Sequence, residues 1–98
     1  MFENLVGLQV ANEKLYREYR KAMLPILKEH GGGFGYDFKV SNVLINQSGN
    51  PINRVFTIYF PDEITAKKFF SNRKYLEAKE TYFNKAVECT TIISEYEK

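Results

Sequence analysis

Cysteine and histidine each occur only once in this 98-residue sequence, as Cys89 and His30. One thiol excludes an internal disulfide, and one cysteine with one histidine falls short of the ligand set of a zinc site. We therefore expect no metal and no cofactor. A chain this poor in cysteine suits a reducing compartment, so we expect a cytoplasmic protein.

Long apolar runs and an excess of charge are also missing. No segment approaches the roughly 20 apolar residues that a membrane helix needs, and the N-terminus lacks the basic and apolar regions of a signal peptide. The formal net charge of +2 is too small to favour a nucleic acid or a membrane as partner, and we expect neither. The sequence is instead 44% hydrophobic, with seven tyrosines and eight phenylalanines, which predicts one folded domain over residues 1–98.

The clearest strand pattern covers residues 53–60 and ends at Pro61. Residues that are β-branched or aromatic fill this segment, and a proline stops a strand. Neither of its faces is charged; they read Phe56, Ile58, Phe60 and Val55, Thr57, Tyr59. An antiparallel sheet usually leaves one face to water, so this pattern predicts a strand that is covered on both sides.

Helical spacing of apolar residues predicts a first helix over residues 13–29. Asn12 is expected to cap it, Pro25 to kink or split it, and the glycines at 31–33 to end it. The second helical region is predicted to comprise a helix capped by Asp62, a break at Ser71-Asn72 and a further helix over residues 73–85.

Period-two alternation predicts three more strands, at residues 3–10, 34–45 and 87–96, the second with a bulge near Ser41-Asn42. The order of elements is then strand, helix, strand, strand, helix, strand. This order predicts an α+β fold, a ferredoxin-like βαββαβ sandwich with a four-stranded antiparallel sheet whose first and third strands are central.

Two helices cover only one face of such a sheet, which leaves the other face without a cover. We assign to the helix-covered face Val6, Leu8, Val10, Phe56, Ile58, Phe60, Val87, Cys89 and Ile93. The opposite face then carries Leu5, Gly7, Val55, Thr57, Tyr59 and Ile92. Left in water, the second set forms an apolar patch of the kind that marks an interface, so we expect a homodimer that packs sheet to sheet.

Five residues are candidates for a ligand site, namely Tyr16, Tyr19, Arg54, Tyr59 and Tyr75. A guanidinium near tyrosines would bind a carboxylate or an enolate in a pocket between helices and sheet. The alternative is that the tyrosines pack at the edge of the core and that Arg54 pairs with an acid such as Asp37 or Glu95.

The single histidine, the single cysteine and a glycine-rich segment have structural explanations. His30 is expected at a helix C-terminus, where the helix dipole favours an imidazolium, and Cys89 in a strand beside Glu88, which opposes thiolate formation. The glycines at 31–33 follow a helix, whereas a phosphate loop follows a strand and opens a helix. Residues 31–38 also resemble an RNA-recognition signature, but that signature belongs on the third strand and not the second.

Four segments carry a resemblance to a known family. They are residues 16–19 (Tyr-Arg-Glu-Tyr), Pro25 with Gly31-Gly32, residues 54–61 (Arg-Val-Phe-Thr-Ile-Tyr-Phe-Pro), and Ala66 with Phe69-Phe70-Ser71 and Tyr75. Over nearly its whole length the sequence resembles domain of unknown function 1330, a family of small bacterial proteins in the dimeric α+β barrel superfamily. The family often has a proline soon after that serine, where this chain has Asn72-Arg73, and the turn at residues 46–51 also departs from it.

The resemblance implies the fold more than the function, and two classes of function follow. The first is a small-molecule binding protein, or a cofactor-independent enzyme by analogy with the monooxygenases and isomerases among related barrels. The second is a non-catalytic dimeric module. No nucleophile–base pair in the sequence names a reaction, so whether the protein is an enzyme stays open. A pocket with a polar anchor favours the first class, and a filled core favours the second.

Overall fold

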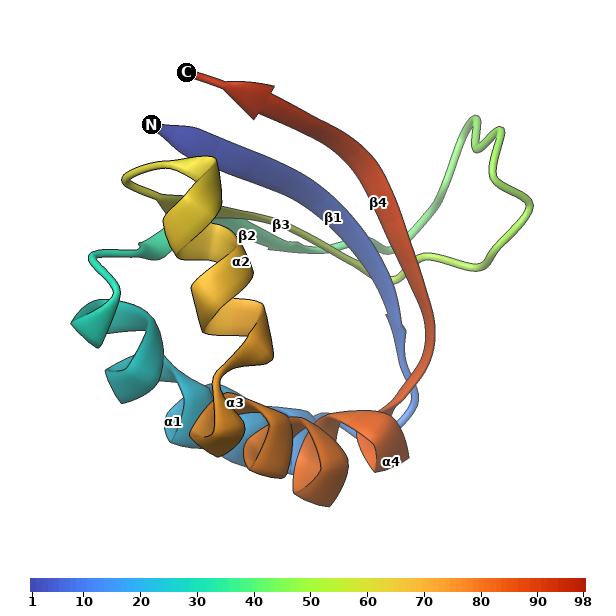
Figure 1. Cartoon of the computed structure of the whole chain (residues 1–98). Helices are drawn as coiled ribbons and strands as arrows, with labels where there is room; N and C mark the ends of the chain where they lie inside the picture. The colour runs from blue at the N-terminus through green and yellow to red at the C-terminus, as the bar shows by residue number, and fades with distance from the viewer.

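Four antiparallel strands form one curved sheet, and every helix lies on its inner side (Figure 1). The structure is a computed structural model that describes all of residues 1–98. The strands are β1 (Phe2–Val10), β2 (Gly33–Lys39), β3 (Arg54–Phe60) and β4 (Val87–Glu97). The helices are α1 (Glu13–Glu29), α2 (Glu63–Ser71), α3 (Arg73–Ala78), the π-helix η1 (Lys79–Phe83) and α4 (Asn84–Ala86).

The strand order is β2-β3-β1-β4, so β1 and β3 are the central pair. This confirms the predicted ferredoxin-like α+β fold and the central place of the 53–60 segment. Val6 lies opposite Phe56, and Asn4 lies opposite Ile58. Cross-strand partners point to the same face of a sheet, and these four face the helices.

Helix α1 packs one apolar face against the sheet. Its buried residues are Tyr16, Tyr19, Met23, Ile26 and Leu27. As predicted, Asn12 caps the helix, because its side chain accepts a hydrogen bond from the Leu15 N–H at 3.0 Å, and Gly31 follows the helix with φ of +72°. Of the two alternatives predicted at Pro25, a kink or a split, the split is wrong, because the helix runs through the proline to Glu29.

The second helical region is one interrupted path along the same side of the sheet. The Asp62 side chain caps α2 and accepts from the Thr65 N–H at 2.7 Å. Asn72 breaks the path as predicted, and its side chain caps α3. The predicted helix over 73–85 contains an unforeseen π-helical turn, in which the Asn84 N–H bonds to the Lys79 carbonyl five residues earlier.

The second strand is shorter than its alternation predicted. It ends at Lys39, and residues 40–53 form an irregular loop that projects beyond the sheet (Figure 1). The apolar residues that suggested a strand are exposed, Leu44 by 87% and Ile45 by 93%. The bulge lies between Phe34 and Asp37 and not near Ser41-Asn42, which lies in this loop.

Two irregularities in the pairing of β1 with β4 change which β4 residues face the helices. They fall between Leu5 and Val6 and between Gln9 and Val10. The last strand therefore changes phase twice. Ile92 pairs with Val6 and faces the helices, whereas Cys89 pairs with Gln9 and faces away.

The prediction that placed Cys89 and Ile93 under the helices and Ile92 on the other face is therefore wrong. Ile93 has no partner on β1 at all, because the extra residue of a bulge stays unpaired.

The sheet face that no helix covers, which we call the far face, is less apolar than predicted. Tyr59 lies there, with its ring where a side chain at Gly33 would be. Glu3 also lies there and is almost fully buried. Its carboxylate accepts a hydrogen bond from the Tyr96 hydroxyl at 2.9 Å and lies 3.5 Å from the Lys98 ammonium. Among the helices, none has the length and apolar character needed to span a bilayer.

Candidate ligand-binding cavity

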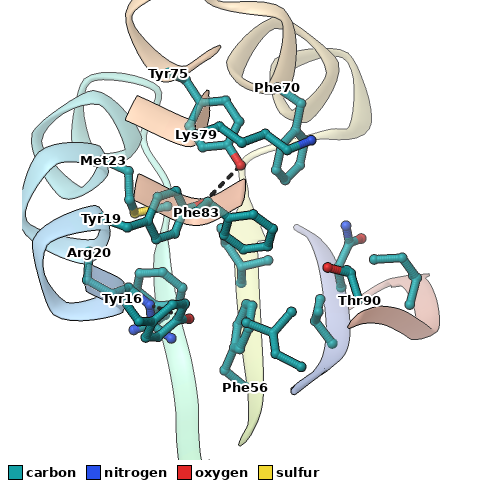
Figure 2. Close-up of a pocket in the computed structure, with 16 residues that line it drawn as sticks. Tyr16, Tyr19, Arg20, Met23, Phe56, Phe70, Tyr75, Lys79, Phe83 and Thr90 are labelled. Atoms are coloured by element: carbon teal, nitrogen blue, oxygen red, sulfur yellow. Dashed lines mark hydrogen bonds between the residues drawn. The ribbon is translucent and has the colours of Figure 1, made fainter. Parts of the chain in front are cut away.

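A cavity of about 250 Å³ lies between α1, the π-helical turn and the inner face of the sheet (Figure 2). Twelve of its 16 lining residues are hydrophobic. Side chains from α1 form one wall, Phe56 and its neighbours form the floor, and Thr90 of β4 lies opposite α1. A ligand pocket is typically apolar with a few placed polar groups, and the remaining lining residues are Asn4, Arg20, Lys79 and Thr90.

The wall from α1 consists of residues three or four positions apart. Tyr16, Tyr19, Arg20 and Met23 all line the cavity, because this spacing repeats on one side of an α-helix. Tyr16 and Met23 are each 1% exposed. The segment at residues 16–19, which carries part of the family resemblance, thus contributes Tyr16 and Tyr19 to the cavity wall.

Two tyrosine hydroxyls meet at one end of the cavity. Tyr19 Oη lies 2.9 Å from Tyr75 Oη, and both side chains are buried. Burial raises the pKa of both phenols, that of Tyr19 well above its ordinary value, so both are neutral at physiological pH. Only one hydroxyl hydrogen lies between the two oxygens, so the second O–H is free to donate.

The π-helical turn directs two further side chains at the cavity. Lys79 and Phe83 both line it, as does Tyr75 four residues before Lys79. Residues four apart lie on one face of a helix, and π-helical turns recur at functional sites. Lys79 is half-buried, and its side chain extends from the helix toward Phe70 in Figure 2. It takes part in none of the ion pairs of the structure.

Asn4 is the one polar residue that β1 contributes to the cavity lining. It is 7% exposed, and its side-chain oxygen has no hydrogen-bond partner in the protein. Most buried polar atoms do have a partner, and an unmade hydrogen bond costs about 1–3 kcal/mol. An amide oxygen without a partner at a cavity wall is therefore a position where a hydrogen-bond donor of a ligand would complete the bonding.

Arg20 lines the cavity but is held by the protein. Its Nε donates to Tyr16 Oη at 2.9 Å, its guanidinium lies 3.9 Å from the centroid of the Phe34 ring, and it pairs with Asp37 at 3.2 Å. Burial is the largest influence on the Tyr16 hydroxyl and raises its pKa, against the opposing effect of Arg20. These contacts hold the Arg20 and Tyr16 side chains in place in the α1 wall of the cavity.

Arg54, proposed above as an anion anchor, is bound by an acid of the protein. It donates to both Asp37 carboxylate oxygens, at 2.7 and 2.8 Å, and lies 3.7 Å from Glu13. Partial burial opposes ionisation of Asp37, but hydrogen bonds from Arg54 and the charge of Arg20 outweigh it and lower its pKa. The same hydrogen bond raises the pKa of Arg54.

The structure therefore brings three of the five candidate residues together and not the other two. Tyr16, Tyr19 and Tyr75 line the cavity, whereas Arg54 stands outside it with Asp37, and Tyr59 lies on the far face. The alternative pairing of Arg54 with Asp37 is the one observed.

Sequence reasoning missed Asn4, Arg20 and Lys79. For Asn4 a signal exists, because it stands two residues before Val6 and four before Leu8 on the face that the alternation points inward. Arg20 lies four residues from Tyr16, which is a helical neighbour. Lys79 lies four residues after the candidate Tyr75, so the same helical spacing is the signal for it.

The single histidine and cysteine take no part in the cavity. His30 is the C-cap residue of α1, and its Nδ1 lies 2.8 Å from the Ile26 carbonyl oxygen. Because a carbonyl oxygen only accepts hydrogen bonds, Nδ1 carries the proton and donates it. Cys89 is half-buried on the far face. No group of three or more His, Cys, Asp or Glu side chains is arranged to hold a metal ion.

The sequence of residues 5–96 matches a protein family described as Domain of unknown function (DUF1330). The chain belongs to this family. Among functionally curated proteins, none matches the sequence. The DUF1330 match agrees with the resemblance carried by the α1 tyrosines and the β3 segment, both of which now have places in the fold.

Solved structures similar to this DUF1330 chain share its fold at low sequence identity. RPA0582, a protein of unknown function from Rhodopseudomonas palustris, has a TM-score of 0.80 at 18% identity, over 99% of this chain and 81% of that one. Protein Atu4242 from Agrobacterium tumefaciens has a TM-score of 0.68 at 13% identity, over 99% and 92%. An uncharacterised NIPSNAP domain protein from Burkholderia xenovorans has a TM-score of 0.66 at 10% identity, over 100% and 94%.

Proposed function

We propose that this DUF1330 protein binds one small, largely apolar organic molecule in the cavity between α1 and the sheet. The observation that carries the proposal is Asn4, a buried amide without a partner in the wall of an otherwise apolar cavity. A filled core would have favoured a purely structural module. An apolar space with an unbonded polar anchor favours a binding protein.

The size of the cavity limits the ligand. An engineered apolar cavity of about 150 Å³ in another protein holds benzene, so 250 Å³ suits a ligand of about ten non-hydrogen atoms. This is smaller than a nucleotide or a drug-sized cofactor. The ligand is expected to be a single substituted ring or a branched chain of similar bulk.

The lining supports binding more than it supports chemistry. No carboxylate and no histidine lines the cavity, and its three tyrosines are neutral. A general base with a pKa near the working pH is thus missing. We therefore propose that the protein binds its ligand without reacting with it. The alternative is catalysis without a cofactor, by analogy with the monooxygenases and isomerases among related barrels.

The two methionines of the chain provide the test. Met23 lines the cavity and is 1% exposed, whereas Met1 lies outside it and is 53% exposed. Protein labelled with ¹³C at the methionine methyl groups is titrated with a set of small ring compounds, both neutral and anionic. We expect saturable shifts of the Met23 signal with the Met1 signal unchanged. Equal shifts of both signals, or none with any compound, would contradict the proposal.

We further propose that two copies of the chain pack through their far faces. Phe38 lies opposite Val55 on that face, is 55% exposed and stacks with Tyr36, which is 60% exposed. The neighbouring loop also leaves Leu44 and Ile45 in water. Exposed aromatic and aliphatic side chains gathered in this way mark an interface. Because one patch would meet its own copy, the contact is expected to be two-fold symmetric.

A further inference from the structure

Given binding in the cavity, we infer that the ligand is a compact organic anion, a monocarboxylic acid in the simplest case, whose charged oxygen is bound by Lys79. The inference deepens the proposed function, on which it rests, by naming the class of ligand. It depends on the charges that line the cavity and on the hydrogen-bond donors around them.

The charges that line the cavity have one sign only. Arg20 and Lys79 are the two ionised residues among the lining side chains, and no aspartate or glutamate is present there. The charge of Arg20 is balanced by Asp37, 3.2 Å away. The charge of Lys79 is not balanced by any carboxylate within ion-pair distance. The cavity therefore carries one uncompensated positive charge.

Hydrogen-bond donors also predominate at the cavity wall. The Tyr19–Tyr75 pair keeps one O–H without a partner, and the Asn4 NH₂ can donate two N–H bonds, whereas its unpartnered oxygen accepts and would need a donor on the body of the ligand. Because Tyr75 lies one four-residue step before Lys79, its hydroxyl and the ammonium come from the same side of the helical path. A carboxylate accepts about four hydrogen bonds, so it would satisfy several of these donors at once.

A neutral apolar ligand would leave these groups unbonded. It would fill the space between Phe56, Ile58 and Met23, but it would bury the Lys79 ammonium and the Asn4 NH₂ further from water without giving these donors an acceptor. An anion with an apolar body uses both parts of the lining. Hydrogen bonds in which one partner is ionised are roughly twice as strong as neutral ones.

A matched pair of compounds tests the inference. Phenylacetate and phenylacetamide have the same size and shape, and only the first is charged at neutral pH. Both are titrated into the wild-type protein and followed by the Met23 methyl signal. We expect phenylacetate to bind about tenfold more tightly than phenylacetamide.

Two lysine variants with the same change of charge show which residue is responsible. Lys79→Met removes the ammonium group but leaves an uncharged side chain of similar length. This variant is expected to bind both compounds with nearly equal affinity. Lys74→Met alters an exposed lysine of α3 outside the cavity, and it is expected to keep the tenfold preference. Because both variants are also compared by their unfolding temperature, a loss of fold is recognised directly.

The possible results distinguish a failure of the anionic ligand from a failure of binding in the cavity. If phenylacetamide binds as tightly as the acid, or if Lys79→Met keeps the preference, the inference is overturned while binding in the cavity stands. If neither compound shifts Met23 but neutral hydrocarbons do, the ligand is not an anion. If no compound of either kind shifts Met23, the proposed function and the inference both fail.

Discussion

The Tyr19 hydroxyl oxygen lies 2.9 Å from that of Tyr75, and this hydrogen bond ties α1 to α3 across residues that are 56 positions apart in the chain. The two residues belong to separate helical segments that meet only because both pack on the same sheet face. Their bond closes one end of the cavity, so the fold and the cavity share this contact.

Replacing either tyrosine of the pair by phenylalanine is expected to destabilise the fold by about 1 kcal/mol, because the remaining hydroxyl loses its buried partner. The double variant is expected to lose less than the sum of the single losses, with a coupling of roughly 0.5–1.5 kcal/mol. Urea unfolding of the four proteins measures these values. Tyr82→Phe is the control, because Tyr82 is half-buried and its hydroxyl forms no hydrogen bond within the protein. Strictly additive losses would show that the two hydroxyls do not interact.

Replacing Asn4 by leucine is expected to stabilise the ligand-free protein. The substitution removes a buried carbonyl oxygen without a partner and puts a side chain of similar size against Val6 and Ile58, a gain of about 1 kcal/mol. The same variant is expected to bind phenylacetate more weakly, because leucine lacks the N–H groups that Asn4 can donate to the carboxylate. Thermal unfolding and the Met23 titration measure the two effects. A variant that is less stable and binds equally well would show that Asn4 has a structural role.

Asp37 is expected to make the stability of the fold dependent on acid pH. Its pKa in the folded protein lies below the ordinary value of 3.8, so the ionised carboxylate stabilises the fold above that value. This stabilisation is lost as the pH falls through the lowered folded pKa. The Asp37→Asn variant lacks this stabilisation at every pH, because no carboxylate then lies between Arg54 and Arg20.

The measurement is urea unfolding of wild type and Asp37→Asn between pH 7 and about pH 2. The gap in unfolding free energy is expected to be largest at neutral pH and to shrink in acid. Glu77→Gln, which alters an exposed carboxylate without an ion pair, is the control and is expected to show no such gap. A gap for Asp37→Asn that stays constant with pH would mean that the ion pair does not stabilise the fold.

A charge placed on the far face is expected to abolish the proposed dimer. Phe38→Asp would bring two carboxylates into a symmetric contact, which typically buries about 1,600 Å² in a stable pair. Sedimentation equilibrium is expected to give twice the 11.5 kDa chain mass for wild type and the single mass for the variant. Ile64→Asp is the control, since Ile64 is 68% exposed on α2, away from the sheet. A monomeric wild type at tens of micromolar would contradict the dimer.

Much of the fold follows from local patterns in the sequence. The run of apolar residues in β3 predicts a central strand, and the Asn12 and Asp62 caps mark where helices begin. These features depend on near neighbours in the chain. The two irregularities of β4 do not, because they arise from pairing with β1, and a one-residue slip there exchanges the two faces of the strand.

The cavity was predictable in part for the same reason. Tyr16 and Tyr19 are marked by helical spacing, and Asn4 by its place in the alternation of β1. Lys79 is marked by its helical spacing from Tyr75, whereas no local pattern predicts the π-helical turn that begins at Lys79. The pairing of Arg54 with Asp37 depends on the register of β2 with β3, so the sequence left it as one of two alternatives.

A crystal structure of the protein grown with phenylacetate would show directly whether the cavity binds a compact anion. We expect electron density for the ring between Met23 and Ile58, with the carboxylate within hydrogen-bond distance of Lys79 Nζ and the Asn4 NH₂ within reach of the ligand. Density found only outside the cavity, such as in the wider hollow beneath residues 40–52, would contradict it, as would a cavity that stays empty at a saturating concentration of the acid.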